Sequence, residues 1–103
     1  MAREALQTLS EPMYYILLAL LEESCGVDIM TKVEIISAGR IRVGPGTAYA
    51  LLDKFLKEKI IRITKVEGRK KSYIITDYGK ELLEKEYERL RTMVNEGRSL
   101  LGK

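Results

Sequence analysis

The spacing of apolar residues along the chain changes twice, and each change marks a different kind of element. Up to residue 59, apolar side chains recur three or four positions apart, as on the buried face of a helix. Residues 60–66 and 72–76 are instead rich in β-branched and aromatic side chains, which is typical of strands. From residue 77 the helical spacing returns and continues to about residue 101. The sequence therefore predicts a mainly α protein with one small β-hairpin.

Capping residues set the boundaries of the first two predicted helices. Ser10 is a good N-cap for a helix over 11–23, whose middle is apolar on all sides. Asp28 lies in the first turn of a second helix, which ends near Ser37 with Gly39 as its C′ residue. The side chains expected to point inward from the second helix are Ile29, Val33 and Ile36.

A third helix, over residues 44–58, has the pattern of a DNA recognition helix. Pro45 suits the first helical position, where the amide group has no internal partner. One face is apolar and should be buried, and it consists of Ala48, Leu51, Leu52, Phe55 and Leu56. The other face, with Tyr49 on its flank, consists of Gly46, Thr47, Ala50, Asp53, Lys54 and Lys57. Such a helix, closely preceded by another, can place its N-terminal end in a DNA major groove.

The distribution of charge supports this interpretation. The 103 residues carry a net charge of +3, but residues 40–71 hold ten Lys or Arg against three acids, a net of +7. Arg40 and Arg42, in the connector before the third helix, belong to this basic segment. Positive charge concentrated around a groove-sized helix indicates nucleic-acid binding, and a solvated basic surface is the alternative.

The predicted hairpin ends in a basic tip, because Arg69, Lys70 and Lys71 fall in the turn region 67–71. Three cations are an inefficient way to stabilise a turn, so we expect them to contact DNA phosphates or the minor groove. A turn that only increases solubility is the alternative.

The final helix, residues 77–103, carries a heptad pattern that predicts dimerisation. Its apolar stripe is spaced alternately by four and three positions and consists of Leu83, Tyr87, Leu90, Val94, Gly97 and Leu101. The distal half extends beyond what a chain of this length can cover, so we expect a homodimer, with packing within one chain as the alternative. Residues 1–76 then form a winged helix-turn-helix domain with an N-terminal arm over residues 2–9.

Composition argues against several functional classes. Histidine is absent and Cys25 is the only cysteine, so neither a His/Cys metal site nor an intrachain disulfide is expected. The usual general base is missing as well, and we expect no enzyme activity and no cofactor. Cys25 is interpreted as a packing residue, with redox sensing as the alternative. The longest apolar run, residues 13–21, is too short for a bilayer and no signal-peptide pattern is present, so a cytoplasmic location is expected.

Three short motifs occur together: the helix start PGTAY, the wing GRKKSY and the entry TDYG to the last helix. With the EPMYYILLALLEE segment, they resemble the PadR family of bacterial and archaeal transcriptional regulators, in its compact branch with a short C-terminal part, over essentially the whole chain. The resemblance implies a winged helix-turn-helix and a homodimer joined through the C-terminal helix with help from the N-terminal helix. It also implies binding to palindromic operator DNA, usually as a repressor. By motif match, it assigns DNA contacts to Thr47, Tyr49, Arg69, Lys70, Lys71 and Tyr73.

Lys59 departs from the family pattern, because the family prefers Gly at this helix-ending position. If the backbone there is left-handed, Lys costs about 1 kcal/mol relative to Gly.

Tyr14 and Tyr15 mark a candidate effector site, because the first helix lies where the family's dimers meet and some relatives bind flat hydrophobic effectors. Apolar walls with phenol groups suit a planar aromatic molecule. The alternative is that both tyrosines are simply packed.

We therefore expect a dimeric, sequence-specific DNA-binding regulator. The alternative is a winged-helix interaction module whose basic face binds an acidic protein. RNA binding has less support, because Phe55 lies on the core face and few aromatic side chains remain for stacking on bases. The expected DNA contacts are Arg40, Arg42, Thr47, Tyr49, Ala50, Lys54, Lys57, Arg69, Lys70, Lys71 and Tyr73.

Overall fold

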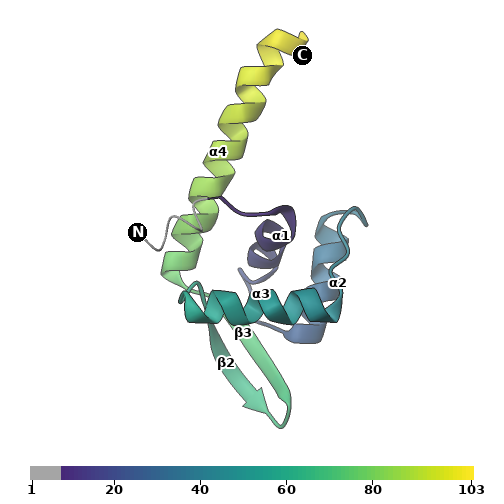
Figure 1. Cartoon of the computed structure of the whole chain (residues 1–103), viewed down its shortest axis with the longest axis vertical. Coiled ribbons are helices and arrows are strands. Elements are labelled where there is room, and N and C mark those ends of the chain that lie inside the picture. Colours follow the sequence, from purple (N-terminus) through teal and green to yellow (C-terminus); the bar gives the residue numbers. More distant parts are fainter. Residues whose placement is uncertain (1–7) are drawn as a thin grey trace.

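The computed structural model describes residues 8–103, and its elements confirm the predicted mainly α winged helix-turn-helix (Figure 1). The helices are α1 (Glu11–Ala19), α2 (Gly26–Ile36), α3 (Pro45–Lys57) and α4 (Asp77–Leu101). The strands are β1 (Ser24–Cys25), β2 (Ile61–Glu67) and β3 (Lys70–Ile75). Residues 2–7 of the predicted N-terminal arm lie outside the described residues. Within residues 8–103, every helix is too short or too polar to cross a membrane.

The first helix is shorter than predicted, because sheet pairing takes up the chain after Leu20. α1 ends at Ala19, not near residue 23. The Leu20 carbonyl accepts a hydrogen bond of 2.9 Å from the amide of Ile75 in β3. Ser24 and Cys25 then pair with the same strand as β1. The apolar run over residues 13–21 therefore extends past the end of α1 into the turn that leads to β1.

The sheet has three antiparallel strands in the order β1-β3-β2, one more than the predicted hairpin. β1 spans only two residues, too few for a recognisable strand pattern. The hairpin turn is also tighter than predicted, because Glu67 pairs with Lys70 and only Gly68 and Arg69 form the turn. Gly68 has the positive φ, 63°, that such a short turn requires. Lys70 and Lys71 therefore lie in β3 and not at the tip.

The core lies between α1, α2, α3 and the sheet, and its most deeply buried side chains are Ile16, Leu17, Leu20, Ile29, Val33, Leu52, Phe55, Ile60 and Ile61. The prediction that Ile36 points inward is wrong, because its side chain is 46% exposed. Ser37, four residues after Val33, takes the inward position at the end of α2. Its hydroxyl accepts a hydrogen bond of 3.0 Å from the amide of Ile41, which fixes the start of the connector.

Both α2 and α3 end in a left-handed residue that is not glycine. The C′ residue of α2 is Ala38, with φ 54°, so the prediction of Gly39 at C′ is wrong by one position. Lys59 follows α3 with φ 61°, which confirms the left-handed backbone considered for this position. In each case the next amide bonds the carbonyl five residues earlier, at 2.8 Å and 2.9 Å. This pattern is a Schellman motif, which satisfies the last helical carbonyls.

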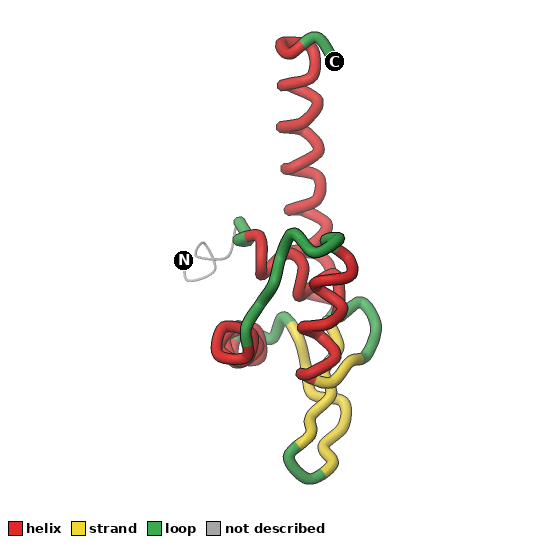
Figure 2. Tube along the Cα trace, turned by 90° about the vertical axis from the view of Figure 1, so that its right-hand side faces the viewer, coloured by secondary structure: helices red, strands yellow, loops and turns green. Residues whose placement is uncertain are grey.

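α4 begins after Thr76, which is its N-cap residue. The Oγ1 atom of Thr76 accepts a hydrogen bond of 3.1 Å from the Gly79 amide and donates one of 2.9 Å to the Ile60 carbonyl. Leu83, in the second turn, is 5% exposed and packs into the core. Beyond Leu90 the side chains of α4 are exposed, apart from the half-buried Gly97. Figure 2 shows α4 and the β2–β3 hairpin leaving the helical body at opposite ends.

Candidate nucleic-acid interface

α3 presents the exposed face that its sequence predicts. Gly44 is its extended N-cap and Pro45 its first residue. Ala48, Leu52 and Phe55 are at most 1% exposed, whereas Leu51 and Leu56 are only half-buried. The residues predicted to face outward are all exposed, namely Gly46, Thr47, Ala50, Asp53, Lys54 and Lys57. Tyr49, on the flank, is 41% exposed.

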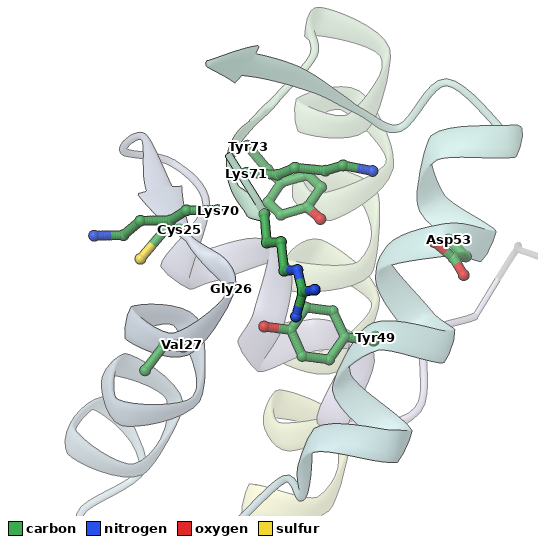
Figure 3. Close-up of a pocket in the computed structure, with 9 residues that line it drawn as sticks. Cys25, Gly26, Val27, Tyr49, Asp53, Lys70, Lys71 and Tyr73 are labelled. Carbon is green, nitrogen blue, oxygen red and sulfur yellow. The ribbon is translucent and has the colours of Figure 1, made fainter. Parts of the chain in front are cut away.

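A cavity of about 490 Å³ joins α3 to the start of α2 and to the wing (Figure 3). Its lining residues are Cys25, Gly26, Val27, Tyr49, Asp53, Arg69, Lys70, Lys71 and Tyr73. Four wing residues predicted to contact DNA therefore meet here with Tyr49 of α3. The cavity also contains the first residues of α2, whose amides carry the positive end of the helix dipole. Sequence patterns did not indicate that the start of α2 contributes to this surface.

Tyr73 lies on the floor of this cavity and is 5% exposed. Burial raises the pKa of its phenol, and the nearby Tyr49 and Asp53 raise it further. The hydroxyl therefore stays protonated at neutral pH and is able to donate a hydrogen bond. A buried, neutral donor beside cations is chemically suited to a phosphate oxygen.

The wing cations divide between two directions, because successive side chains of a strand point to opposite faces. Lys71 and Tyr73 share one face of β3, whereas Lys70 lies on the other. Figure 3 shows the side chains of Lys70 and Lys71 extending in opposite directions. Arg69 occupies the turn itself. All three cations are exposed, so the basic surface follows the wing from its tip toward the cavity.

The two connector arginines are paired within the chain. A guanidinium nitrogen of Arg40 lies 3.0 Å from the Glu11 carboxylate and donates a hydrogen bond of 3.0 Å to the Tyr15 hydroxyl. Arg42 lies 3.2 Å from the carboxylate of Glu34 in α2. Both arginines are exposed, and their predicted DNA contacts stay predictions. The sequence did not reveal these partners: Glu11 and Tyr15 are distant from Arg40 in the chain, whereas Glu34 lies in the helix that precedes the connector.

Comparison with protein families matches residues 16–85 to the sequence model of the transcriptional regulator PadR-like family. The match runs from the middle of α1 into α4. The chain belongs to this family. Transcriptional regulator YqjI of Escherichia coli is 29% identical over 69 residues, which are 67% of this chain and 33% of that protein. The chain thus spans about a third of the length of the curated relatives that it matches.

Solved structures of the family share the fold. A PadR-like transcriptional regulator from Bacillus cereus is 30% identical, with a TM-score of 0.68 and coverage of 100% of this chain and 97% of that one. A PadR family transcription regulator from Clostridium difficile is 19% identical, with a TM-score of 0.69 and coverage of 86% and 97%. This chain therefore shares the winged-helix fold of the PadR-like family to which it belongs.

Tyr14 and Tyr15, the candidate effector residues of this PadR-like regulator, are half-buried and form an edge-to-face pair with ring centroids 5.7 Å apart. Burial raises the pKa of Tyr14, and the neighbouring Tyr87, Tyr15 and Glu86 raise it further. Two grooves of about 200 and 220 Å³ adjoin the pair. Both are smaller than the roughly 300 Å³ at which ligand pockets usually begin. The aromatic effector stays a prediction, and one chain alone offers it little space.

The predicted dimerisation stripe divides between the core and solvent. Leu83 is buried in its own chain and Leu90 is half-buried. Tyr87, Val94 and Leu101 are 53%, 63% and 73% exposed. The distal stripe therefore remains uncovered by the described residues of its own chain, as its heptad spacing led us to expect.

α4 also contains a buried carboxylate that the sequence analysis missed. Glu86 is 2% exposed and forms two hydrogen bonds with the Arg89 guanidinium, of 2.9 Å and 2.6 Å. These bonds lower the pKa of Glu86 against the effect of burial, which raises it, and the Leu9 backbone amide lowers it further. The available signal was the spacing of three residues between an acid and an arginine beside an apolar stripe.

Proposed function

We propose that this chain is a dimeric repressor that inserts α3 into the major groove of a palindromic operator. The β2–β3 wing then lies on the DNA backbone or in the minor groove. The observation that carries this proposal is the cavity where Tyr49 of α3 faces the wing residues Arg69 and Lys71. One surface thus combines a helix for base edges with cations for phosphates, the two kinds of contact that specific binding to a duplex needs.

The exposed apolar stripe of α4 supports a dimer as the binding unit. The distal part of α4 exposes large apolar side chains, including Met93, Val94, Leu100 and Leu101. A second copy is an economical cover for such a stripe, because two-fold symmetry brings identical stripes together. A two-fold protein reads two half-sites of opposite orientation, so a palindromic operator follows from the same symmetry.

Selection of bound fragments from genomic DNA of the source organism tests this function. The selected duplex and a random duplex of equal length should then be titrated over a range of salt concentrations. We expect both affinities to fall steeply with salt, with the selected duplex bound about 10³-fold or more tightly. A module that binds an acidic protein instead would show little salt-sensitive binding to either duplex.

Placing the selected duplex between a promoter and a reporter gene tests the sign of regulation. A repressor lowers reporter output when it is expressed, and mutation of either half-site should relieve this effect. An increase in output would contradict repression while leaving DNA binding intact.

A further inference from the structure

Gly26, the first residue of α2, lies directly under the ring of Tyr49. A Cβ atom added to Gly26 would lie 2.5 Å from Oη, 2.8 Å from Cε1 and 2.9 Å from Cζ of Tyr49. Real Cβ atoms essentially never approach heavy atoms so closely. Figure 3 shows the Tyr49 hydroxyl directed from α3 toward Gly26. The end of the tyrosine ring thus occupies the space that any side chain at position 26 would need.

The backbone gives no other reason for glycine here. The glycines with positive φ among residues 8–103 are Gly39, Gly68 and Gly102, so Gly26 has a conformation open to any residue. It also begins a helix, where alanine is preferred to glycine. The atoms around it differ from those around Gly79, whose Cβ would lie 2.2 Å from the Ile60 carbonyl oxygen, a part of the backbone. At Gly26 all three close atoms belong to one side chain.

That side chain is placed for recognition. Tyr49 is 41% exposed and lines the cavity shared by α2, α3 and the wing. The hydroxyl is at the far end of a long side chain, so a change of χ1 rotamer moves it and alters which base or phosphate it reaches. Because Gly26 has no side chain, the Tyr49 ring has room to lie between α3 and the start of α2.

We propose that Gly26 is a positioning residue: it admits the Tyr49 ring against the start of α2 and so sets the orientation in which Tyr49 reads the operator. This inference rests on the proposed DNA-binding function and adds to it a residue of α2. A side chain at position 26 displaces the ring, since the Tyr49 hydroxyl forms no hydrogen bond within residues 8–103 that would hold the ring in place. The fold survives, and recognition changes.

A double-mutant cycle tests the proposal, with Gly26→Ala measured in the native chain and in a Tyr49→Ala chain. In the native chain the substitution should weaken binding to the selected duplex by about 5- to 150-fold per half-site, the usual loss of one base contact. Random-duplex binding should change by less than about twofold. In the Tyr49→Ala chain, which has no ring to displace, Gly26→Ala should change neither affinity beyond about twofold. This second background is the matched control, because it contains the same alanine at the same helix start.

Several outcomes overturn the proposal. Native affinity for the selected duplex in the Gly26→Ala protein would show that the ring position is not needed. An equal loss in both backgrounds would assign the effect to α2 itself. Unfolding of the variant, seen as loss of helical circular dichroism, would show that the ring cannot move aside.

A readout without DNA separates this inference from the proposed function. The ring ¹H–¹³C resonances of Tyr49, in protein labelled at tyrosine, should shift on Gly26→Ala, while those of Tyr78 and Tyr87, which do not line the cavity, should not. If the chain binds no duplex selectively but Tyr49 shifts, the function is wrong and the steric relation stands. If Tyr49 does not shift, the positioning role is wrong whatever the chain binds.

Discussion

The Arg40 guanidinium donates a hydrogen bond of 3.0 Å to the hydroxyl of Tyr15 and so ties the connector before α3 to α1. The same guanidinium contacts the Glu11 carboxylate, and its carbon lies 5.9 Å from the centre of the Tyr15 ring. A candidate effector residue is thus in direct contact with the segment that leads into the recognition helix. Contact between Arg40 and a phosphate would require these interactions to break.

Because Glu11 and Tyr15 hold the guanidinium, we revise the DNA contact expected of Arg40 from the sequence. Arg40→Ala should lower the salt dependence of DNA binding by much less than about 0.9 per chain, the value for one lost phosphate contact. The ion pair is exposed, so its loss should change folding stability little. Titrations on random duplex at several salt concentrations measure the slope. A decrease of about 0.9 per chain would instead place Arg40 on a phosphate.

The wing cations should contribute most of the salt dependence of DNA binding. Replacing Arg69, Lys70 and Lys71 by Ala removes up to six phosphate contacts from a dimer and should flatten the slope by as much as about 5. Because phosphate contacts carry little sequence information, affinity for the selected and the random duplex should fall together. Salt-dependent titrations of both duplexes provide the measurement.

A control variant removes the same charge elsewhere. Lys85, Arg98 and Lys103 are exposed on or after α4, and their replacement by Ala should change the slope only slightly. If the two triple variants behave alike, net charge and not the position of the wing explains the binding. If the wing variant loses only the selected duplex, the wing reads sequence and our assignment is wrong.

Substitution of Tyr49 should weaken binding to the selected duplex alone, in contrast to the wing substitutions. Tyr49→Ala removes a ring edge and a hydroxyl from α3, and we expect a cost of about 1–3 kcal/mol per half-site on the selected duplex. Random-duplex affinity and the salt slope should hardly change. The helix should persist, since Tyr49 is exposed and the buried face of α3 is formed by Ala48, Leu52 and Phe55. Equal losses on both duplexes would contradict a role in reading bases.

The sequence predicted the helices of this fold because their signals are local. The helix spacing of α3, the N-caps Ser10 and Thr76, and the strand composition of the wing each act within a few residues. The missed features depend on distant partners. α1 stops early because the carbonyl of Leu20 bonds the amide of Ile75, and no pattern within 11–23 encodes that competition.

The same distinction applies to the candidate site. The exposed face of α3 and the basic wing were evident from spacing and charge, and both are exposed in the structure. The place of Gly26 under Tyr49 depends on how two helices cross, and the burial of Glu86 depends on how α4 lies against the domain. Sequence spacing gives the face of an element, whereas the atoms opposite that face come from the tertiary fold.

The distal half of α4 should hold the dimer together. Leu90→Asp with Val94→Asp places four unpaired charges in a symmetric apolar contact, which is strongly unfavourable. We expect monomer or aggregate in sedimentation experiments at micromolar concentration. Leu83 is unsuitable for this test because it belongs to the core of its own chain.

The matched control adds the same two charges away from the stripe. Thr92→Asp with Asn95→Asp alters two exposed positions of the same part of α4 and should leave the sedimentation coefficient unchanged. Dimers formed by the Leu90 and Val94 variant would place the contact elsewhere. Dissociation of both variants would indicate that charge repulsion, and not the apolar stripe, decides the outcome.

Glu86 should make folding stability depend on pH in the acid range. Its hydrogen bonds with Arg89 lower the pKa of the folded-state carboxyl, so their contribution is present above the unfolded-state pKa and is lost as pH falls through the folded-state value. Glu86→Gln should therefore cost about 1.5–3 kcal/mol at pH 7, and this difference should shrink progressively below about pH 4.5.

Glu88→Gln is the control, because Glu88 has the same three-residue spacing to Arg91 but both partners are exposed. Its cost should be only about 0–1 kcal/mol. Urea unfolding of the native protein and the two variants from pH 3 to pH 7, at one protein concentration, measures both effects. Equal costs for the two variants at pH 7 would mean that burial gives the Glu86–Arg89 pair no special strength. A cost of Glu86→Gln that persists undiminished at pH 3 would mean the same.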